Sequence, residues 1–207
     1  MSGIRLPRMY AIVDAAQTAS PADVTASLLA AGVRLIQYRD KSSSSRQVYE
    51  MSRKMAGEIA LAGGTFIVND RADVALAAGA HGVHVGQADL PARLVRQFFP
   101  PDKIVGVSTH SIAQVAAADR EPVDYIAFGP VFQTQSKANP DPQVGLEGLA
   151  EARKATRKPL VAIGGITLDN ARSVILAGAD SIAVIRELLS APDAGEQARR
   201  FIEIIGD

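Results

Sequence analysis

Two acidic residues, Asp70 and Asp89, carry the first sign of chemistry in this sequence. Each follows a short apolar run, Phe66–Val68 or Val83–Val85, and a helix-like segment separates the two runs. If the runs are neighbouring parallel strands, their ends lie side by side and the carboxylates converge. Mg²⁺ is usually held by one or two carboxylates together with substrate phosphates, so the pair predicts a Mg²⁺ cofactor on a diphosphate. The alternative is that the two acids form salt bridges or cap the helices that follow them.

A cationic segment, Gln37-Tyr38-Arg39-Asp40-Lys41, ends another apolar run. Alternate residues of a strand face the same side, so Gln37, Arg39 and Lys41 are expected to point together into a site. Arg offers a planar fork for phosphate oxygens and Lys a mobile charge. The segment therefore suits a phosphorylated ligand, although a solvated strand end would have the same composition.

A long loop between Gly129 and Gly145 contains a second set of anion-binding residues. Thr134 and Ser136 place hydroxyls at alternate positions, and Lys137 follows them. Loops longer than about 12 residues in compact domains are usually functional or disordered. We expect this loop to bind an anion and to exclude water, the alternative being a polar surface excursion.

Paired glycines, Gly164-Gly165, follow the apolar run Leu160–Ile163 and precede a helix start at Thr167. Glycine lets the backbone approach a ligand, and free N–H groups at a helix start bind phosphate. The pair therefore predicts a phosphate site.

These residues must be positioned by a regular alternation of strands and helices. The candidate strands are Met9–Val13, Leu35–Tyr38, Phe66–Val68, Val83–Val85, Ile104–Val107, Tyr125–Phe128, Leu160–Ile163 and Ser181–Val184. The candidate helices are Pro21–Ala31, Ser44–Ala62, Ala72–Ala78, Pro91–Phe99, Ile112–Ala118, Leu146–Ala155, Leu168–Ala177 and Ala194–Ile205. Such alternation is typical of a parallel sheet with helical crossovers.

A repeated helix-to-strand phrase favours closure of that sheet. Ala-Gly stands just before a candidate strand at Ala31-Gly32, Ala78-Gly79 and Ala177-Gly178, where the glycine is expected to adopt a left-handed conformation. Eight like units predict a single-domain (β/α)₈ TIM barrel over residues 1–207, with an open doubly wound sheet as the competitor. Active sites of such barrels lie at the C-terminal ends of the strands, where the polar residues above fall.

Composition limits which classes of ligand and which cellular compartment we expect for the protein. Lys plus Arg and Asp plus Glu are both 22, so no basic field would attract nucleic acid. The absence of cysteine excludes thiolate chemistry and fits a reducing compartment. No run of about 18 apolar residues is present, so we expect a cytoplasmic protein that does not enter a membrane. A homo-oligomer is compatible with the sequence, which does not fix the oligomeric state.

The sequence supports only weak predictions for the roles of the three histidines. His84 lies within a candidate strand and His81 in the turn before it, at the expected non-catalytic end, so both are predicted to be structural. His110 follows Ser108 at the catalytic end, but no Ser-His-Asp arrangement for hydrolysis is evident.

Taken together, six segments resemble the thiamine-phosphate synthase family over nearly the whole chain. They are Gln37-Tyr38-Arg39-Asp40-Lys41, Val68-Asn69-Asp70-Arg71, His84-Val85-Gly86-Gln87-Ala88-Asp89, Gly106-Val107-Ser108, the loop from Gly129 to Lys137, and Ile163-Gly164-Gly165-Ile166. The resemblance implies a transferase on a (β/α)₈ barrel. It would join hydroxymethylpyrimidine diphosphate to a thiazole phosphate, giving thiamine monophosphate and pyrophosphate.

The resemblance also implies roles for individual residues. Asp70 and Asp89 would hold Mg²⁺ on the diphosphate. The pyrimidine substrate would be bound by Gln37, Tyr38, Arg39, Asp40, Lys41, Asn69, Ser108 and Lys137, of which Arg39, Lys41, Ser108 and Lys137 would act in catalysis. The thiazole phosphate would contact Thr134, Gln135, Ser136, Gly165, Ile185 and Arg186.

These residue types suit a reaction that needs no protein nucleophile. An amino-substituted pyrimidinylmethyl carbon can lose pyrophosphate first, and the thiazole nitrogen then captures the stabilised cation. The enzyme would supply charge neutralisation, positioning and exclusion of water. Arg186, Gln133 and Ser136 depart from the family pattern, which usually has Ser, Pro and Thr there. Two alternatives remain: a thiazole tautomerase on the same barrel, and a catalytically silent phosphate-binding module.

Overall fold

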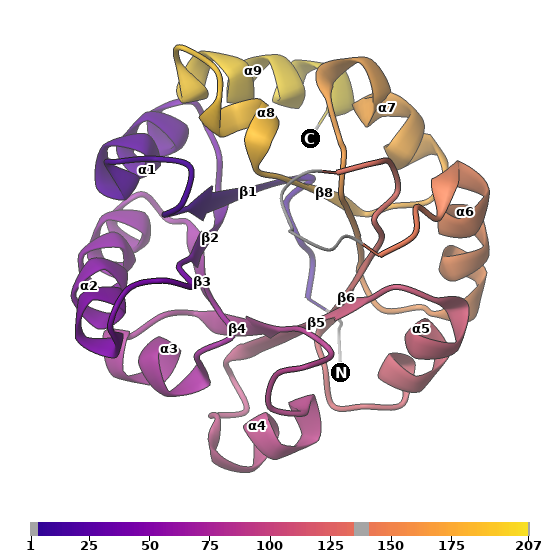
Figure 1. Ribbon diagram of the computed structural model, residues 1–207, viewed down its shortest axis with the longest axis horizontal. Coiled ribbons are helices and arrows are strands. Elements are labelled where there is room, and N and C mark those ends of the chain that lie inside the picture. Colours follow the sequence, from indigo (N-terminus) through magenta and orange to yellow (C-terminus); the bar gives the residue numbers. More distant parts are fainter. Residues whose placement is uncertain (1–3, 135–140, 207) are drawn as a thin grey trace.

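Eight parallel strands close into a barrel in the order β1 to β8 in the computed structural model, which describes residues 4–134 and 141–206 (Figure 1). The strands are β1 Met9–Asp14, β2 Leu35–Arg39, β3 Thr65–Asn69, β4 Gly82–Val85, β5 Ile104–Thr109, β6 Tyr125–Phe128, β7 Leu160–Ile163 and β8 Ser181–Val184. Strand β1 pairs with both β2 and β8, so no sheet edge is left open. The predicted (β/α)₈ barrel is confirmed, and the doubly wound alternative is excluded.

Helices cover the outside of the barrel and connect successive strands. They are α1 Pro21–Ala30, α2 Ser45–Leu61, α3 Ala72–Ala78, α4 Ala92–Phe98, α5 Ile112–Asp119, α6 Gly145–Ala155, α7 Leu168–Leu176, α8 Arg186–Leu189 and α9 Ala194–Ile205. The short helix α8 was not predicted. Its four residues are too few to show the periodicity by which a helix is found in a sequence.

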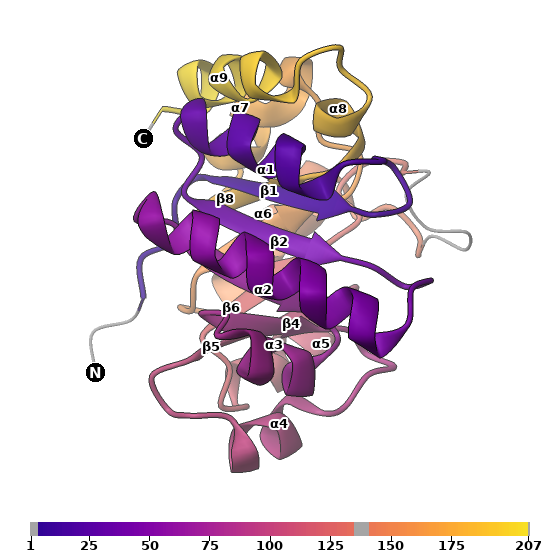
Figure 2. The ribbon, with the colours of Figure 1, turned by 90° about the vertical axis from the view of Figure 1, so that its left-hand side faces the viewer.

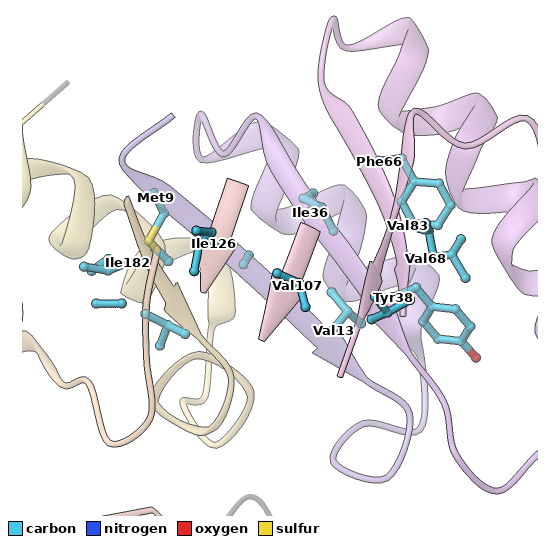
Figure 3. Packing of buried hydrophobic residues seen from close by; sticks show 14 of the residues in the cluster. Met9, Val13, Ile36, Tyr38, Phe66, Val68, Val83, Val107, Ile126 and Ile182 are labelled. Atoms are coloured by element: carbon cyan, nitrogen blue, oxygen red, sulfur yellow. The ribbon is translucent and has the colours of Figure 1, made fainter. Parts of the chain in front are cut away.

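Two hydrophobic clusters follow from the alternation of side chains along each strand. Outward residues such as Ile36, Phe66 and Val68 pack with the helices, as Figure 3 shows. Inward residues such as Leu35 and Ile67 fill the barrel interior. Each strand is therefore buried on both faces, which explains why the candidate strands read as continuous apolar runs.

Several strands are longer than predicted at the end where we expected the site. Asp14, Arg39, Asn69 and Thr109 continue the strand ladders beyond the apolar runs that predicted them. These polar residues consequently stand on rigid backbone rather than in loops, a placement that gives a site precise geometry.

The repeated Ala-Gly phrase has the predicted geometry. Gly32, Gly79 and Gly178 have φ values of 95°, 74° and 110°, in the left-handed region. In the Gly79 copy, the glycine N–H closes the end of α3 and the next strand begins at Gly82.

The segment before β1 packs against the barrel at the end from which the strands start. Leu6 is buried in the inner cluster, where Ile4 packs against it. Figure 2 places this segment opposite the arrowheads of β1 and β2. Over the described ranges, no helix has both the length and the apolar character needed to cross a membrane.

Candidate active site

A cavity of about 410 Å³ opens at the C-terminal ends of the strands. Side chains from β1 to β8 and from the loops that follow them line its wall. Eight of the predicted site residues lie there: Gln37, Arg39, Asn69, Ser108, Thr134, Gly165, Ile185 and Arg186.

Asp70 and Asp89 lie together beside this cavity, as predicted. The pKa of Asp70 is raised, first by burial and then by the neighbouring Asp89 carboxylate, while Lys41 acts to lower it. The Lys41 ammonium stands 3.1 Å from Asp70 Oδ2. The sequence prediction that the two carboxylates converge is therefore confirmed.

Of the two alternative roles, a salt bridge is present between Asp70 and Lys41, whereas helix capping is excluded. Helix α3 begins after Arg71 and helix α4 after Pro91, and neither helix start has a side-chain cap hydrogen bond. Asp89 instead accepts a hydrogen bond from the Gly86 N–H at 2.7 Å, which fixes the turn after β4. Asp70 has φ 61°, a left-handed conformation that costs energy for a residue with a side chain.

Arg39 points into the cavity from the end of β2 and forms an ion pair with Asp14. Asp14 is buried at the end of the adjacent strand β1, and its carboxylate also accepts a hydrogen bond from the Ala16 N–H at 3.0 Å. Because its position is fixed on two sides, this carboxylate orients the Arg39 guanidinium. Sequence reasoning did not assign that role to Asp14.

Two further predicted substrate-binding residues, Tyr38 and Asp40, do not line the cavity, and their contact with substrate stays a prediction. Tyr38 lies on the outward face of β2 within the outer hydrophobic cluster (Figure 3), because it alternates with the inward residues Gln37 and Arg39. Its hydroxyl donates to Asp40 at 2.9 Å. Asp40 also accepts from the N–H groups of Ser42 and Ser43, so it shapes the turn before α2 and does not line the cavity.

Gln135, Ser136 and Lys137 lie outside the described residues. Thr134, just before them, lines the cavity.

The prediction that His84 lies at the non-catalytic end of the barrel is wrong. His84 is the third of four residues in β4, so it lies close to the C-terminal end of the strand and faces the cavity. Its Nε2 atom is 2.8 Å from Ser108 Oγ, and its Nδ1 atom is 2.9 Å from the Tyr125 hydroxyl. The glycine at position 106 was a signal in the sequence. In the structure Gly106 pairs with His84 across β4 and β5, and a side chain at Gly106 would collide with the Tyr125 ring.

The other two histidines have different surroundings. The His81 ring accepts a hydrogen bond from the Phe66 N–H at 3.1 Å, in agreement with its predicted structural role. His110 lines the cavity, and its ring donates to the Gly129 carbonyl at 2.5 Å and lies 3.5 Å from Asp141. His110 thus connects the two ends of the long loop.

The turn after β7 meets the start of α7 on the far side of the cavity. Asn170 holds this turn: its side-chain oxygen accepts from the Thr167 N–H at 2.9 Å, and its nitrogen donates to the Gly165 carbonyl at 3.0 Å. A side chain at Gly164 would collide with Pro130, and one at Gly165 with Phe132 and Gln133. The paired glycines are therefore required by the close approach of the long loop as well as by their place in the cavity wall.

Comparison with known proteins identifies the family. The family model described as thiamine monophosphate synthase matches residues 9–188. The thiamine-phosphate synthase of Koribacter versatilis is 49% identical and covers 99% of this chain and 98% of its own length. That of Albidiferax ferrireducens is 41% identical over 96% of this chain and 91% of its own length.

A solved structure agrees with these sequence matches. Thiamine phosphate pyrophosphorylase from Pyrococcus furiosus superposes with a TM-score of 0.88 at 33% identity, covering 96% of this chain and 95% of that one. From these matches and the closed barrel, the chain belongs to the thiamine monophosphate synthase family of transferase enzymes.

Proposed function

We propose that the protein joins hydroxymethylpyrimidine diphosphate to a thiazole phosphate, with or without a carboxylate on the thiazole, and releases thiamine monophosphate and pyrophosphate. One observation carries the proposal. The cluster of Lys41, Asp70 and Asp89 stands at the ends of β2 to β4, beside the cavity, whereas Gly165 and Arg186 follow β7 and β8 and line the cavity itself. This arrangement supports two phosphate sites, one at the acidic cluster through a shared cation and one at the glycine turn, as a reaction between two phosphorylated substrates requires.

Mg²⁺ is the proposed cofactor at the first of these sites. Two adjacent carboxylates are the hard oxygen ligands that the ion prefers, and their mutual repulsion is relieved by a shared cation. In the ranges that the structure describes, no third His, Cys, Asp or Glu joins them in a metal-binding group, so diphosphate oxygens and water would supply the remaining ligands. When bound, the ion would neutralise charge on the departing diphosphate.

The residues on the pyrimidine side would act mainly by electrostatics. Arg39, held by Asp14, and Lys41, paired with Asp70, place positive charge at the diphosphate. The bond between the pyrimidinylmethyl carbon and the diphosphate oxygen breaks first, and pyrophosphate leaves with the electron pair. The amino-substituted ring stabilises the cation that remains. No protein nucleophile is needed, and Lys137 stays a predicted further cation.

The thiazole phosphate would lie against Gly165, Ile185 and Arg186, close to Thr134. Its ring nitrogen would then face the pyrimidinylmethyl carbon and donate its lone pair to form the new carbon–nitrogen bond. Fixing the two substrates in one cavity replaces a bimolecular encounter with a positioned one. Contacts of Gln135 and Ser136 with this phosphate stay predictions, as do the cytoplasmic location and any homo-oligomer.

The test is to incubate the purified protein with both substrates and Mg²⁺ and to measure pyrophosphate and thiamine monophosphate. We expect equal amounts of the two products, and none without the thiazole phosphate. A thiazole tautomerase or a silent phosphate-binding module would release no pyrophosphate, so that result would contradict the proposal.

A further inference from the structure

A continuous chain of hydrogen bonds crosses the barrel interior, and four of its five residues line the cavity. Gln37 Nε2 donates to the Tyr10 hydroxyl at 2.7 Å, and the hydroxyls of Tyr10 and Tyr125 are 2.9 Å apart. The chain continues from Tyr125 to His84 Nδ1 at 2.9 Å and from His84 Nε2 to Ser108 Oγ at 2.8 Å. The five residues come from the strands β1, β2, β4, β5 and β6.

The direction of this chain follows from counting protons, because a tyrosine hydroxyl has only one proton to donate. Tyr10 accepts from the Gln37 amide, and among the residues that the structure describes the Tyr125 hydroxyl is the acceptor within reach of its own proton, so Tyr10 donates to Tyr125. Tyr125 then donates to His84 Nδ1, which must be unprotonated. The neutral imidazole therefore carries its proton on Nε2 and donates it to Ser108 Oγ, which leaves the serine proton to be donated elsewhere.

The surroundings support a fixed direction. Tyr10 and Tyr125 are completely buried, and burial raises the pKa of both hydroxyls, so they stay protonated at neutral pH. The Tyr125 ring stacks on His84 at a centroid distance of 5.5 Å and contacts the Tyr10 ring edge-on at 6.1 Å. Because Ser108 and His84 line the cavity, the remaining serine proton is available to a ligand.

We propose that Tyr10 and Tyr125 are positioning residues that hold His84 as the neutral Nε2–H tautomer and thereby present the Ser108 hydroxyl as a hydrogen-bond donor. The matching ligand atom is an acceptor, either a diphosphate oxygen or a ring nitrogen of the pyrimidine substrate. The identity of that ligand rests on the proposed function, whereas the direction of the chain does not. Rotation of the Gln37 amide would reverse every donor and would make Ser108 an acceptor toward the cavity.

The direction can be tested without substrate by ¹⁵N NMR of protein labelled at histidine. We expect the His84 signals, assigned by their loss in His84→Asn, to report a protonated Nε2 and an unprotonated Nδ1. Tyr125→Phe removes the donor to Nδ1 and should give a mixture of tautomers, whereas Tyr49→Phe on helix α2 should change nothing. A proton on Nδ1 in the wild-type protein would overturn the proposal, even if the variants fail to fold.

Kinetics test whether the direction matters to the ligand. Tyr125→Phe and Ser108→Ala should each weaken or remove the hydrogen bond from Ser108 to the ligand. Loss of one hydrogen bond is expected to raise the KM for the pyrimidine diphosphate roughly tenfold. The KM for the thiazole phosphate should not change. Because both changes interrupt one chain, their combination should cost little more than either alone, and additive effects would contradict the coupling. If no pyrophosphate is released by any variant or by wild type, the proposed function fails while the NMR result still stands.

Discussion

Asp70 combines an unfavourable backbone conformation with an unfavourable charge. Its φ of 61° is uncommon for a residue with a side chain, and the pKa of its carboxyl is raised by burial and by Asp89 despite the nearby Lys41. The backbone strain and the raised pKa therefore occur at the same residue, next to the cavity. Strain of this kind is typical of functional sites. We interpret the arrangement as a site prepared for a cation.

Asp70→Asn separates the two costs. Asn tolerates the left-handed conformation, so the turn should persist, while the charge is lost. Removing the repulsion with Asp89 should leave the melting temperature no lower than in wild type. Turnover should fall by roughly two orders of magnitude or more, because departure of the diphosphate loses charge stabilisation. Thermal melting and pyrophosphate release across a Mg²⁺ titration check this, and near wild-type turnover would contradict the proposed metal site.

Asp40 makes a smaller contribution that depends on pH. Burial acts to raise the pKa of its carboxyl, but hydrogen bonds from Ser43, Ser42 and Tyr38 together lower it to about 2. A lowered pKa in the folded state stabilises the fold above the unfolded value of about 3.9, and this stability is lost as pH falls toward 2. Asp40→Asn should therefore lose less stability than wild type over that range. Because Asp40 is partly exposed, the difference should stay below about 1 kcal/mol in urea unfolding.

At the residue scale, the sequence was sufficient to place a side chain when its position follows only from which strand it comes after. Asp70 and Asp89 converge because parallel neighbouring strands bring their ends together, which needs only the order of the strands. His84 was missed because its direction depends on whether it faces the barrel interior or the helices, and a short apolar strand does not reveal that phase. Tyr38 is a different case: the alternation along β2 already set it opposite Gln37 and Arg39, but its assignment came from the family resemblance and not from that phase.

At the scale of elements, the turn between β7 and α7 depends on one amide. Asn170 bonds both Thr167 and Gly165, so its helix position fixes the backbone that would receive the thiazole phosphate. Helix α8 lies next to it after β8, and Arg186 at its start lines the same cavity. A turn held from within a helix is less free to move than one held by loop residues.

Asn170→Ala should loosen this turn without disturbing the opposite side of the cavity. The KM for the thiazole phosphate should rise roughly tenfold, while the KM for the pyrimidine diphosphate stays within about twofold. Asn170→Asp keeps the acceptor for the Thr167 N–H and loses the donor to Gly165. Its KM for the thiazole phosphate should lie between those of wild type and Asn170→Ala. Steady-state kinetics with each substrate varied in turn gives the answer. An equal rise in both KM values would show that the turn does not act on one substrate alone.

The elements themselves were predicted well because their signals are local. Apolar runs, Ala-Gly phrases and the length of α2 can be read within one segment. The features that were not predicted depend on tertiary contacts. Helix α8 is a single turn, and the ends of β1, β2 and β3 are polar residues that join the ladder because a neighbouring strand is present. Gly164 and Gly165 belong to the same group, since the loop that approaches them comes from elsewhere in the chain.

At the scale of the whole molecule, the two ends of the barrel have different charge environments. The strand-start end has a hollow of about 1150 Å³ lined by Arg5, Arg8, Arg34, Arg153, Lys154 and Arg157. Three of these guanidinium groups donate to carbonyls at or beside helix C-termini: Arg34 to Leu29, Arg153 to Thr156, and Arg8 to Ile205. The C-termini of the helices converge at this end and carry partial negative charge, which explains the cations there.

Because the strand-start end and the cavity lie at opposite ends of the barrel, we predict that stability and activity can be changed separately. Leu6 seals the strand-start end and is 8% exposed, so Leu6→Ala should cost about 2 kcal/mol and lower the melting temperature by about 4–8 °C. Both KM values and kcat should stay within about twofold at a temperature where the variant is folded, because the cavity lies at the other end. Leu61→Ala, at a side chain that is 93% exposed, is the matched control and should change neither property. A loss of turnover in folded Leu6→Ala protein would mean that packing at the base of the barrel also sets the geometry of the catalytic end.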